Sequence, residues 1–117
     1  MFLAEAACLE EATEQAQQAV IVGEALLVSD VNNATAANTH ALSMAQLGRC
    51  HLLAATSPKT EATKRGEHLR DAKSAYQRSL EIWIALRDRG ALSGADAGKI
   101  DEATRSIALC EAELARP

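Results

Sequence analysis

Aromatic residues are scarce in this chain, and their scarcity is the first guide to its fold. They make up 3% of the 117 residues, whereas hydrophobic residues together reach 48%. Runs of β-branched residues are also missing, the longest being Val20-Ile21-Val22. Sheets are rich in aromatic and β-branched side chains, whereas alanine, which supplies most of the apolar count here, is the strongest helix former. The composition therefore predicts a single all-α domain over residues 1–117.

Basic residues are absent from residues 1–48, which carry six acids, while residues 49–117 hold all 12 basic residues and 10 acids. One interpretation is a set of solvated helix faces of mixed charge in the second half. The alternative is attraction between the basic half of one molecule and the acidic half of another. Neither interpretation provides the concentrated basic face that nucleic-acid binding requires, so we expect no nucleic-acid partner.

Long apolar runs and paired cysteines are missing as well. No run approaches the roughly 18 apolar residues of a membrane span, and residues 1–5 lack the basic flank of a signal peptide. Cys8, Cys50 and Cys110 are odd in number and include no Cys-x-x-Cys pair. Isolated cysteines of this kind are typical of small buried side chains in a reducing compartment. We therefore expect a cytoplasmic protein that does not associate with membranes.

The spacing of apolar residues predicts four antiparallel helices. The first spans about residues 2–28. The second, about 34–55, is apolar almost all round, so we expect it to lie between two neighbours. The third covers about 59–89, although 59–67 is polar and is expected to be frayed or a loop. The last spans about 95–115 and is apolar on one face only, which is typical of a C-terminal capping helix.

Two of the predicted breaks carry recognisable helix-end signals. Ser57 and Pro58 suit an N-cap followed by the first helical position. The segment 90–98 contains three glycines and is a natural C-cap and connector. Within it, Ser93-x-x-Asp96 is similar to a capping box.

The three histidines do not predict a metal site. Cys50 and His51 are adjacent and therefore point to different sides of a helix, and no second pair supplies the remaining ligands of a zinc ion. His51 is better explained as a packed side chain that, if buried, needs one hydrogen-bond partner and has a lowered pKa. We expect no metal and no cofactor.

Acid–base and nucleophilic chemistry also lack support. Glu10, Glu11 and Glu14 lie on the polar face of the first predicted helix, whereas catalytic carboxylates converge in a pocket. No cysteine has a neighbouring base to activate it. The chain is therefore not expected to be an enzyme.

Two spaced patterns in the centre of the chain match the two helices of a known repeat. They are Met44-x-x-Leu47-Gly48-x-x-His51 and Ala72-x-x-x-Tyr76-x-x-Ser79-Leu80. These patterns resemble a tetratricopeptide repeat, in which small residues allow close helix crossing and larger ones fill the space around it. Met44 stands where the family usually has Trp, and His51 where it has an aromatic residue.

The resemblance extends to both sides of this hairpin. In the first helix, Ala12, Ala16 and Ala19 repeat the spacing of the second pattern at a separation of about 60 residues, against about 34 in a standard repeat. The segments 75–83 and 86–90 resemble the helical repeat region that follows the kinase domain in some bacterial eukaryotic-type Ser/Thr protein kinases. This resemblance implies a regulatory fragment of a larger signalling protein, without the kinase motifs themselves.

Such repeats imply a protein-interaction scaffold whose first helices line a concave surface. The positions turned that way by the motif are Leu42, Ala45, Arg49 and Leu52, where Arg49 would pair with a side-chain or terminal carboxylate. The alternative is a helix–helix seam with one snorkelling arginine. Ala45 and Arg49 differ from the Lys and Asn of the carboxylate-clamp subgroup, so recognition of chaperone C-termini is not expected.

The first helix lacks its own hairpin partner in this arrangement. Residues 2–28 are therefore expected either to pack on the following helices alone or to form a homodimer. The rival functional hypothesis is a structural four-helix oligomerisation unit without a peptide-binding groove.

Overall fold

The computed structural model describes residues 14–15, 17–24, 34–58 and 60–116. Every regular element in these ranges is helical, so the all-α prediction is confirmed. The helices are α2 (Ala34–Thr56), α3 (Ala62–Asp88) and α4 (Lys99–Ala115), with a short 3₁₀ turn, η1 (Gly94–Asp96), before α4. Residues 14–15 and 17–24 are helical as well, as predicted; the rest of 2–28 lies outside the described residues.

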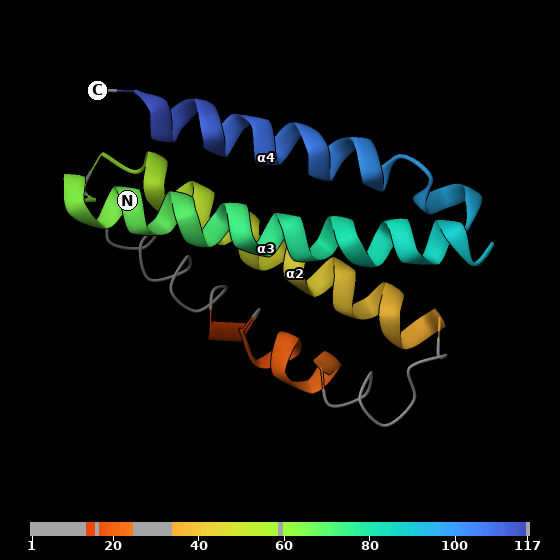
Figure 1. The fold of residues 1–117 in the computed structure, drawn as a ribbon. Helices are drawn as coiled ribbons and strands as arrows, with labels where there is room; N and C mark the ends of the chain where they lie inside the picture. The colour runs from red at the N-terminus through yellow and green to blue at the C-terminus, as the bar shows by residue number, and fades with distance from the viewer. Residues whose placement is uncertain (1–13, 16, 25–33, 59, 117) are drawn as a thin grey trace.

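The helices run in alternating directions, and α3 lies between α2 and α4 (Figure 1). On its other side α2 is flanked by the helical residues 17–24, drawn in orange in Figure 1. Gly23 makes the closest approach there, since a Cβ atom at this position would lie 2.5 Å from Nδ1 of His40. The prediction that the second helix has neighbours on two sides is therefore confirmed.

The helical residues 17–24 turn only some of their apolar side chains towards α2. Gly23 is buried and Val20 half-buried, but Ala19 is exposed. Ile21 and Val22 are 60% and 57% exposed, so two large apolar side chains face away from α2. Ala19 lies one helical turn before Gly23 on the same face, so the contact with α2 is made at Gly23 and does not extend to Ala19.

Two clusters of buried side chains form the core, one near the C-terminal end of α3 and one near its middle. In the first, Trp83 and Leu86 of α3 pack on Ala37 and Ala41 of α2 and are flanked by residues that include Ile100. The second consists of Ala72, Tyr76 and Cys110, with Ala45, Leu52 and Ile107 packed against it. Residues of α3 contribute to both clusters.

The crossing of α2 over α3 is set by a glycine and a tyrosine. A Cβ atom at Gly48 would lie 3.0–3.1 Å from ring carbons of Tyr76, so the ring occupies the space that a side chain would need. Nearby, the buried hydroxyl of Ser79 donates a hydrogen bond to the carbonyl of Ala41 across the same interface, at 3.0 Å. The predicted close approach at Gly48 is confirmed.

The start of α3 differs from the prediction. Pro58 is not the first helical residue; α3 begins at Ala62 after a turn in which Thr60 N–H donates to the carbonyl of Ser57 at 3.1 Å. The expected fraying or loop is wrong for residues 62–67, which are helical. These residues are mostly exposed, and good helix formers such as Ala, Lys, Arg and Glu continue the helix there without packing.

The connector from α3 to α4 contains the predicted C-cap. Gly90 has φ +69°, and its N–H donates to the carbonyl of Arg87, while Ala91 N–H donates to that of Leu86. This pair of bonds is a Schellman motif, which favours glycine at the left-handed position. The following helix starts at Lys99 and not near residue 95, because Gly94–Asp96 form η1 instead. Ser93 is the residue before η1, and its hydroxyl donates to the Asp96 carboxylate at 2.8 Å.

The last helix has the predicted one-sided character. Ala103 and Cys110 are buried, and Ile100, Ile107 and Leu114 are half-buried on the side that faces α3. The charged residues predicted for the opposite face are exposed except Glu113, which is half-buried beside the salt bridge it makes with Arg116.

Replacing Gly48 with alanine tests the crossing. The added methyl group improves helix propensity by up to about 1 kcal/mol, but it must displace the buried Tyr76 ring, and overpacking of a core costs about 1–3 kcal/mol. We expect a net loss of about 1 kcal/mol in the free energy of unfolding, measured by urea denaturation.

Gly66→Ala is the matched control, because Gly66 is also helical but a Cβ atom there meets only the flexible end of Arg70, at 3.4 Å. This variant is expected to gain stability, by up to about 1 kcal/mol. Equal gains in both variants would show that the Tyr76 ring does not restrict the crossing.

Candidate functional site

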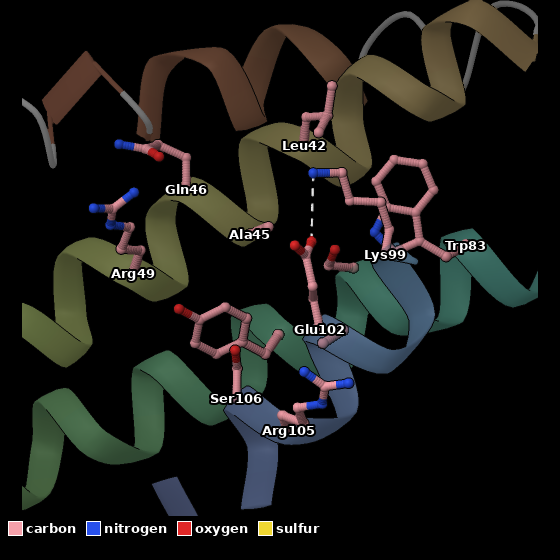
Figure 2. A pocket seen from close by; sticks show the side chains of 12 residues that line it. Leu42, Ala45, Gln46, Arg49, Trp83, Lys99, Glu102, Arg105 and Ser106 are labelled. Carbon is pink, nitrogen blue, oxygen red and sulfur yellow. Dashed lines mark ion pairs between the residues drawn. The ribbon is translucent and has the colours of Figure 1, made fainter. Parts of the chain in front are cut away.

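A groove runs between α2 and α4, with α3 as its floor (Figure 2). Its volume is about 510 Å³. Residues of all three helices line it. They are Leu42, Ala45, Gln46 and Arg49 of α2, Tyr76, Ser79 and Trp83 of α3, and Lys99, Glu102, Ala103, Arg105 and Ser106 of α4.

The floor of the groove is apolar and rigidly held. Tyr76 and Trp83 are 7% and 1% exposed, and they belong to the two core clusters. The only hydroxyl of the floor besides that of Tyr76 belongs to Ser79, which is bonded to the backbone of α2. The two aromatic rings therefore close the base of the groove and are almost fully covered by their neighbours.

The rims of the groove are polar. Figure 2 shows Gln46 and Arg49 extending from α2, opposite Lys99, Glu102 and Arg105 of α4. Lys99 and Glu102 form an ion pair at 3.4 Å, marked by the dashed line, and its exposure makes it weak.

Two arginines, one on each rim of the groove, have no carboxylate partner in the described residues. Arg49 lies on the α2 rim and Arg105 on the α4 rim, and within the described part of the chain neither takes part in a salt bridge. The Lys99 charge is already matched by Glu102. The groove therefore presents two guanidinium groups above an apolar floor.

Tyr76 connects the floor to both rims. Burial raises the pKa of its phenol, whereas a hydrogen bond with Ser106 and the charge of Arg49 act in the opposite direction. A phenol with a raised pKa stays protonated near neutral pH, so Tyr76 can exchange hydrogen bonds but does not act as a base.

The structure places three of the four residues predicted for the concave surface in this groove. Leu42, Ala45 and Arg49 line it. Leu52 does not; it is half-buried and packs against the cluster of Ala72, Tyr76 and Cys110, so it supports the floor from behind. One helical turn beyond Arg49, the α2 side chains on this face meet the core instead of the groove.

The opposite rim was not predicted. Lys99, Glu102, Arg105 and Ser106 belong to a helix whose pattern predicts a C-terminal cap and gives no sign of a binding surface. The spacing of Lys99, Glu102 and Ser106 in steps of three and four does place them on one side of a helix. What the sequence could not supply is the position of α4 relative to α2, two helices that meet mainly through α3.

A second polar feature lies near the turn between α2 and α3. Nδ1 of His51 and Nδ1 of His68 are 3.0 Å apart, and the ring centroids are 5.3 Å apart at an interplanar angle of 36°. Burial lowers the pKa of His51, opposed by the charge of Asp71 and assisted by that of His68. The hydrogen-bond partner and lowered pKa expected for His51 are thus confirmed, and the partner is His68.

The third histidine is more deeply placed. His40 is 0% exposed, and neither ring nitrogen has a hydrogen-bond partner among the residues that the structure describes. Burial lowers its pKa, with the charges of Glu24 and Arg78 acting in opposite directions. His40 fills the space between α2 and the preceding helical segment at Gly23.

Other chemistry has little basis in the described residues. Among them, no group of three or more His, Cys, Asp or Glu side chains is arranged to hold a metal ion. Cys50 and Cys110 are free and buried, as predicted, and burial raises the pKa of Cys110, which makes it a poor nucleophile. Cys8, Glu10 and Glu11 lie outside the described residues.

Comparison with known proteins returns no match: no family model, no curated protein and no solved structure is similar to this chain. None of the helices over the described ranges has the length and apolarity to cross a bilayer.

Acidification is expected to destabilise the fold through the buried histidines. His40 and His51 have pKa values below 6.5 in the folded chain, so between 6.5 and those values the unfolded chain binds more protons. The contribution of these two histidines to the free energy of unfolding is therefore fully present above about pH 6.5, and it is lost as the pH falls below that value. Urea denaturation at a series of pH values measures this slope.

His51→Gln should flatten part of the slope, since His40 remains in this variant. Because carboxylates with ordinary pKa values titrate mainly below about pH 5, the comparison is made above that range. A stability that does not change between neutral pH and pH 5.5, or a slope unaltered by His51→Gln, would contradict this assignment.

Proposed function

We propose that the chain is a protein-interaction module whose groove between α2 and α4 binds a polypeptide segment that carries a carboxylate. One observation carries this proposal. Arg49 and Arg105 line opposite rims of an open groove, and neither forms a salt bridge with an acid in the described residues.

The physical requirements of peptide binding are met by this arrangement. Leu42, which is 42% exposed, and the half-buried Ala45 offer apolar surface against which a side chain of the partner can be buried, above the packed rings of Tyr76 and Trp83. Arginine binds carboxylates through two parallel hydrogen bonds, which gives direction as well as attraction. Gln46 and Ser106 add donors and acceptors for the backbone of the bound segment.

The resemblance to tetratricopeptide repeats supports the same function. In that family the first helix of each hairpin lines the concave surface. If α2 and α3 form one hairpin and α4 begins the next, then α2 and α4 are the two first helices. On this basis we propose a regulatory region of a bacterial signalling protein, without catalysis of its own. The free, buried Cys50 and Cys110 are compatible with a reducing cytoplasm.

A structural oligomerisation unit is the second candidate. It is favoured by Ile21 and Val22, which are 60% and 57% exposed on the helical segment before α2 and would be buried in a homodimer. Light scattering over a range of concentrations, on the wild type and on an Ile21→Lys, Val22→Lys variant, separates the two candidates. A dimer that the double variant abolishes supports oligomerisation through this segment, and a strict monomer excludes it.

Charge reversal in the groove tests peptide binding. Peptides selected from a random displayed library on the immobilised chain are expected to contain Asp, Glu or a free C-terminus near an apolar residue. Arg49→Glu and Arg105→Glu should each weaken binding of such a peptide by at least about tenfold, or about 1.4 kcal/mol. Fluorescence anisotropy with labelled peptide measures the change.

The matched control is Arg70→Glu, which reverses an exposed arginine of α3 outside the groove and should leave affinity within about twofold. A peptide with Lys in place of its acid should regain affinity for Arg49→Glu. Equal losses in all three variants would show a general charge effect, and unchanged affinity in both groove variants would remove the groove from the proposed site.

A further inference from the structure

Two imidazoles from different helices meet near the turn of the α2–α3 hairpin. His51 lies in the last two turns of α2, and His68 lies near the start of α3, 17 residues later. Their Nδ1 atoms are 3.0 Å apart, and both side chains are half-buried. The pair lies outside the groove between α2 and α4.

The separation of the two nitrogens suits a shared metal ion. With metal–nitrogen bonds of about 2.1 Å, nitrogens 3.0 Å apart subtend an angle of about 90° at the ion. This angle fits octahedral or square-planar coordination, and opening the pair by a few tenths of an ångström reaches the tetrahedral angle. Rotation about the side-chain bonds of half-buried histidines is enough for that change.

The arrangement of protons on the two rings also favours a shared metal ion. Two Nδ1 atoms at this distance can share one proton, with one ring donating and the other accepting. They cannot both carry a proton on the facing nitrogens without repulsion. A divalent cation can replace that hydrogen bond when the donating ring moves its proton from Nδ1 to Nε2. Each neutral imidazole then offers the lone pair of its Nδ1 atom, and no net proton is released.

We propose that His51 and His68 form a bidentate site for a divalent transition-metal ion that prefers nitrogen ligands, of the zinc, nickel and copper class. Magnesium and calcium prefer oxygen ligands and are not expected to bind there. The two histidines supply two ligands, and water completes the coordination sphere. Asp71 lies three residues after His68, on the same side of α3, and its negative charge adds to the attraction for a cation.

Binding at this site joins α2 to α3. The ion holds two residues on either side of the hairpin turn, and this juxtaposition is absent from the unfolded chain. The metal therefore binds the folded form preferentially and raises its stability in proportion to concentration. It acts as a clamp on the hairpin that also carries the α2 rim of the groove.

Thermal unfolding of the chain tests the site. After removal of metals with a chelator, excess Zn²⁺ or Ni²⁺ near neutral pH should raise Tm by at least about 4 °C, and Mg²⁺ should not. His51→Gln and His68→Gln should each remove the increase while keeping a polar side chain. Glu67→Gln is the matched control, because it alters an exposed acid next to His68 and should keep the increase.

A second measurement uses the wild-type chain alone and so does not depend on whether a variant folds. In NMR spectra of the wild-type chain, substoichiometric Ni²⁺ should broaden the imidazole signals of His51 and His68 first and leave those of the buried His40 unchanged. No change in Tm with Zn²⁺ or Ni²⁺ would overturn the proposal. So would an increase that persists in both histidine variants, or broadening confined to His40 or to other parts of the chain.

Discussion

The packing of the Tyr76 ring against the backbone of Gly48 is the contact on which the rest of this structure depends. It brings α2 close enough to α3 for the Ser79 hydroxyl to donate a hydrogen bond to the α2 backbone, and it keeps the Tyr76 ring between the two helices. From there Tyr76 reaches Cys110 on one side and lines the groove on the other. A single close approach therefore determines the spacing of the hairpin, the seat of α4 and the floor of the groove.

Much of the fold could be predicted from the sequence because its signals are local. Alanine content and three-four spacing are sufficient to define α2 and α4 to within a few residues, and the left-handed conformation at Gly90 follows from its place after an apolar helix. The predictions that are wrong concern the start of α3, where contacts with other helices do not determine whether the chain is helical. Residues 62–67 are helical by propensity alone, and Pro58 lies in a turn, because the helix begins only after Thr60 has closed that turn on the α2 carboxyl end.

The candidate sites were harder to predict, since each depends on contacts between helices. Leu42, Ala45 and Arg49 follow from the repeat-like spacing, but their partners Lys99, Glu102 and Arg105 come from a helix whose placement no local pattern determines. The histidine pair shows the same limit. His51 and His68 are 17 residues apart, and only the length of the turn and the start of α3 decide that their rings meet.

The short connector after α3 has a consequence for how such a groove can change over evolution. Residues 89–98 join the floor helix to one wall, and their path is determined by the Schellman motif at Gly90, by η1 and by Leu92, which packs against the cluster of Trp83 and Leu86. Inserting or deleting a residue there would slide α4 along α3 and bring different side chains opposite Arg49. A change in the length of the connector can therefore alter ligand preference while the buried contacts between α2 and α3 stay the same.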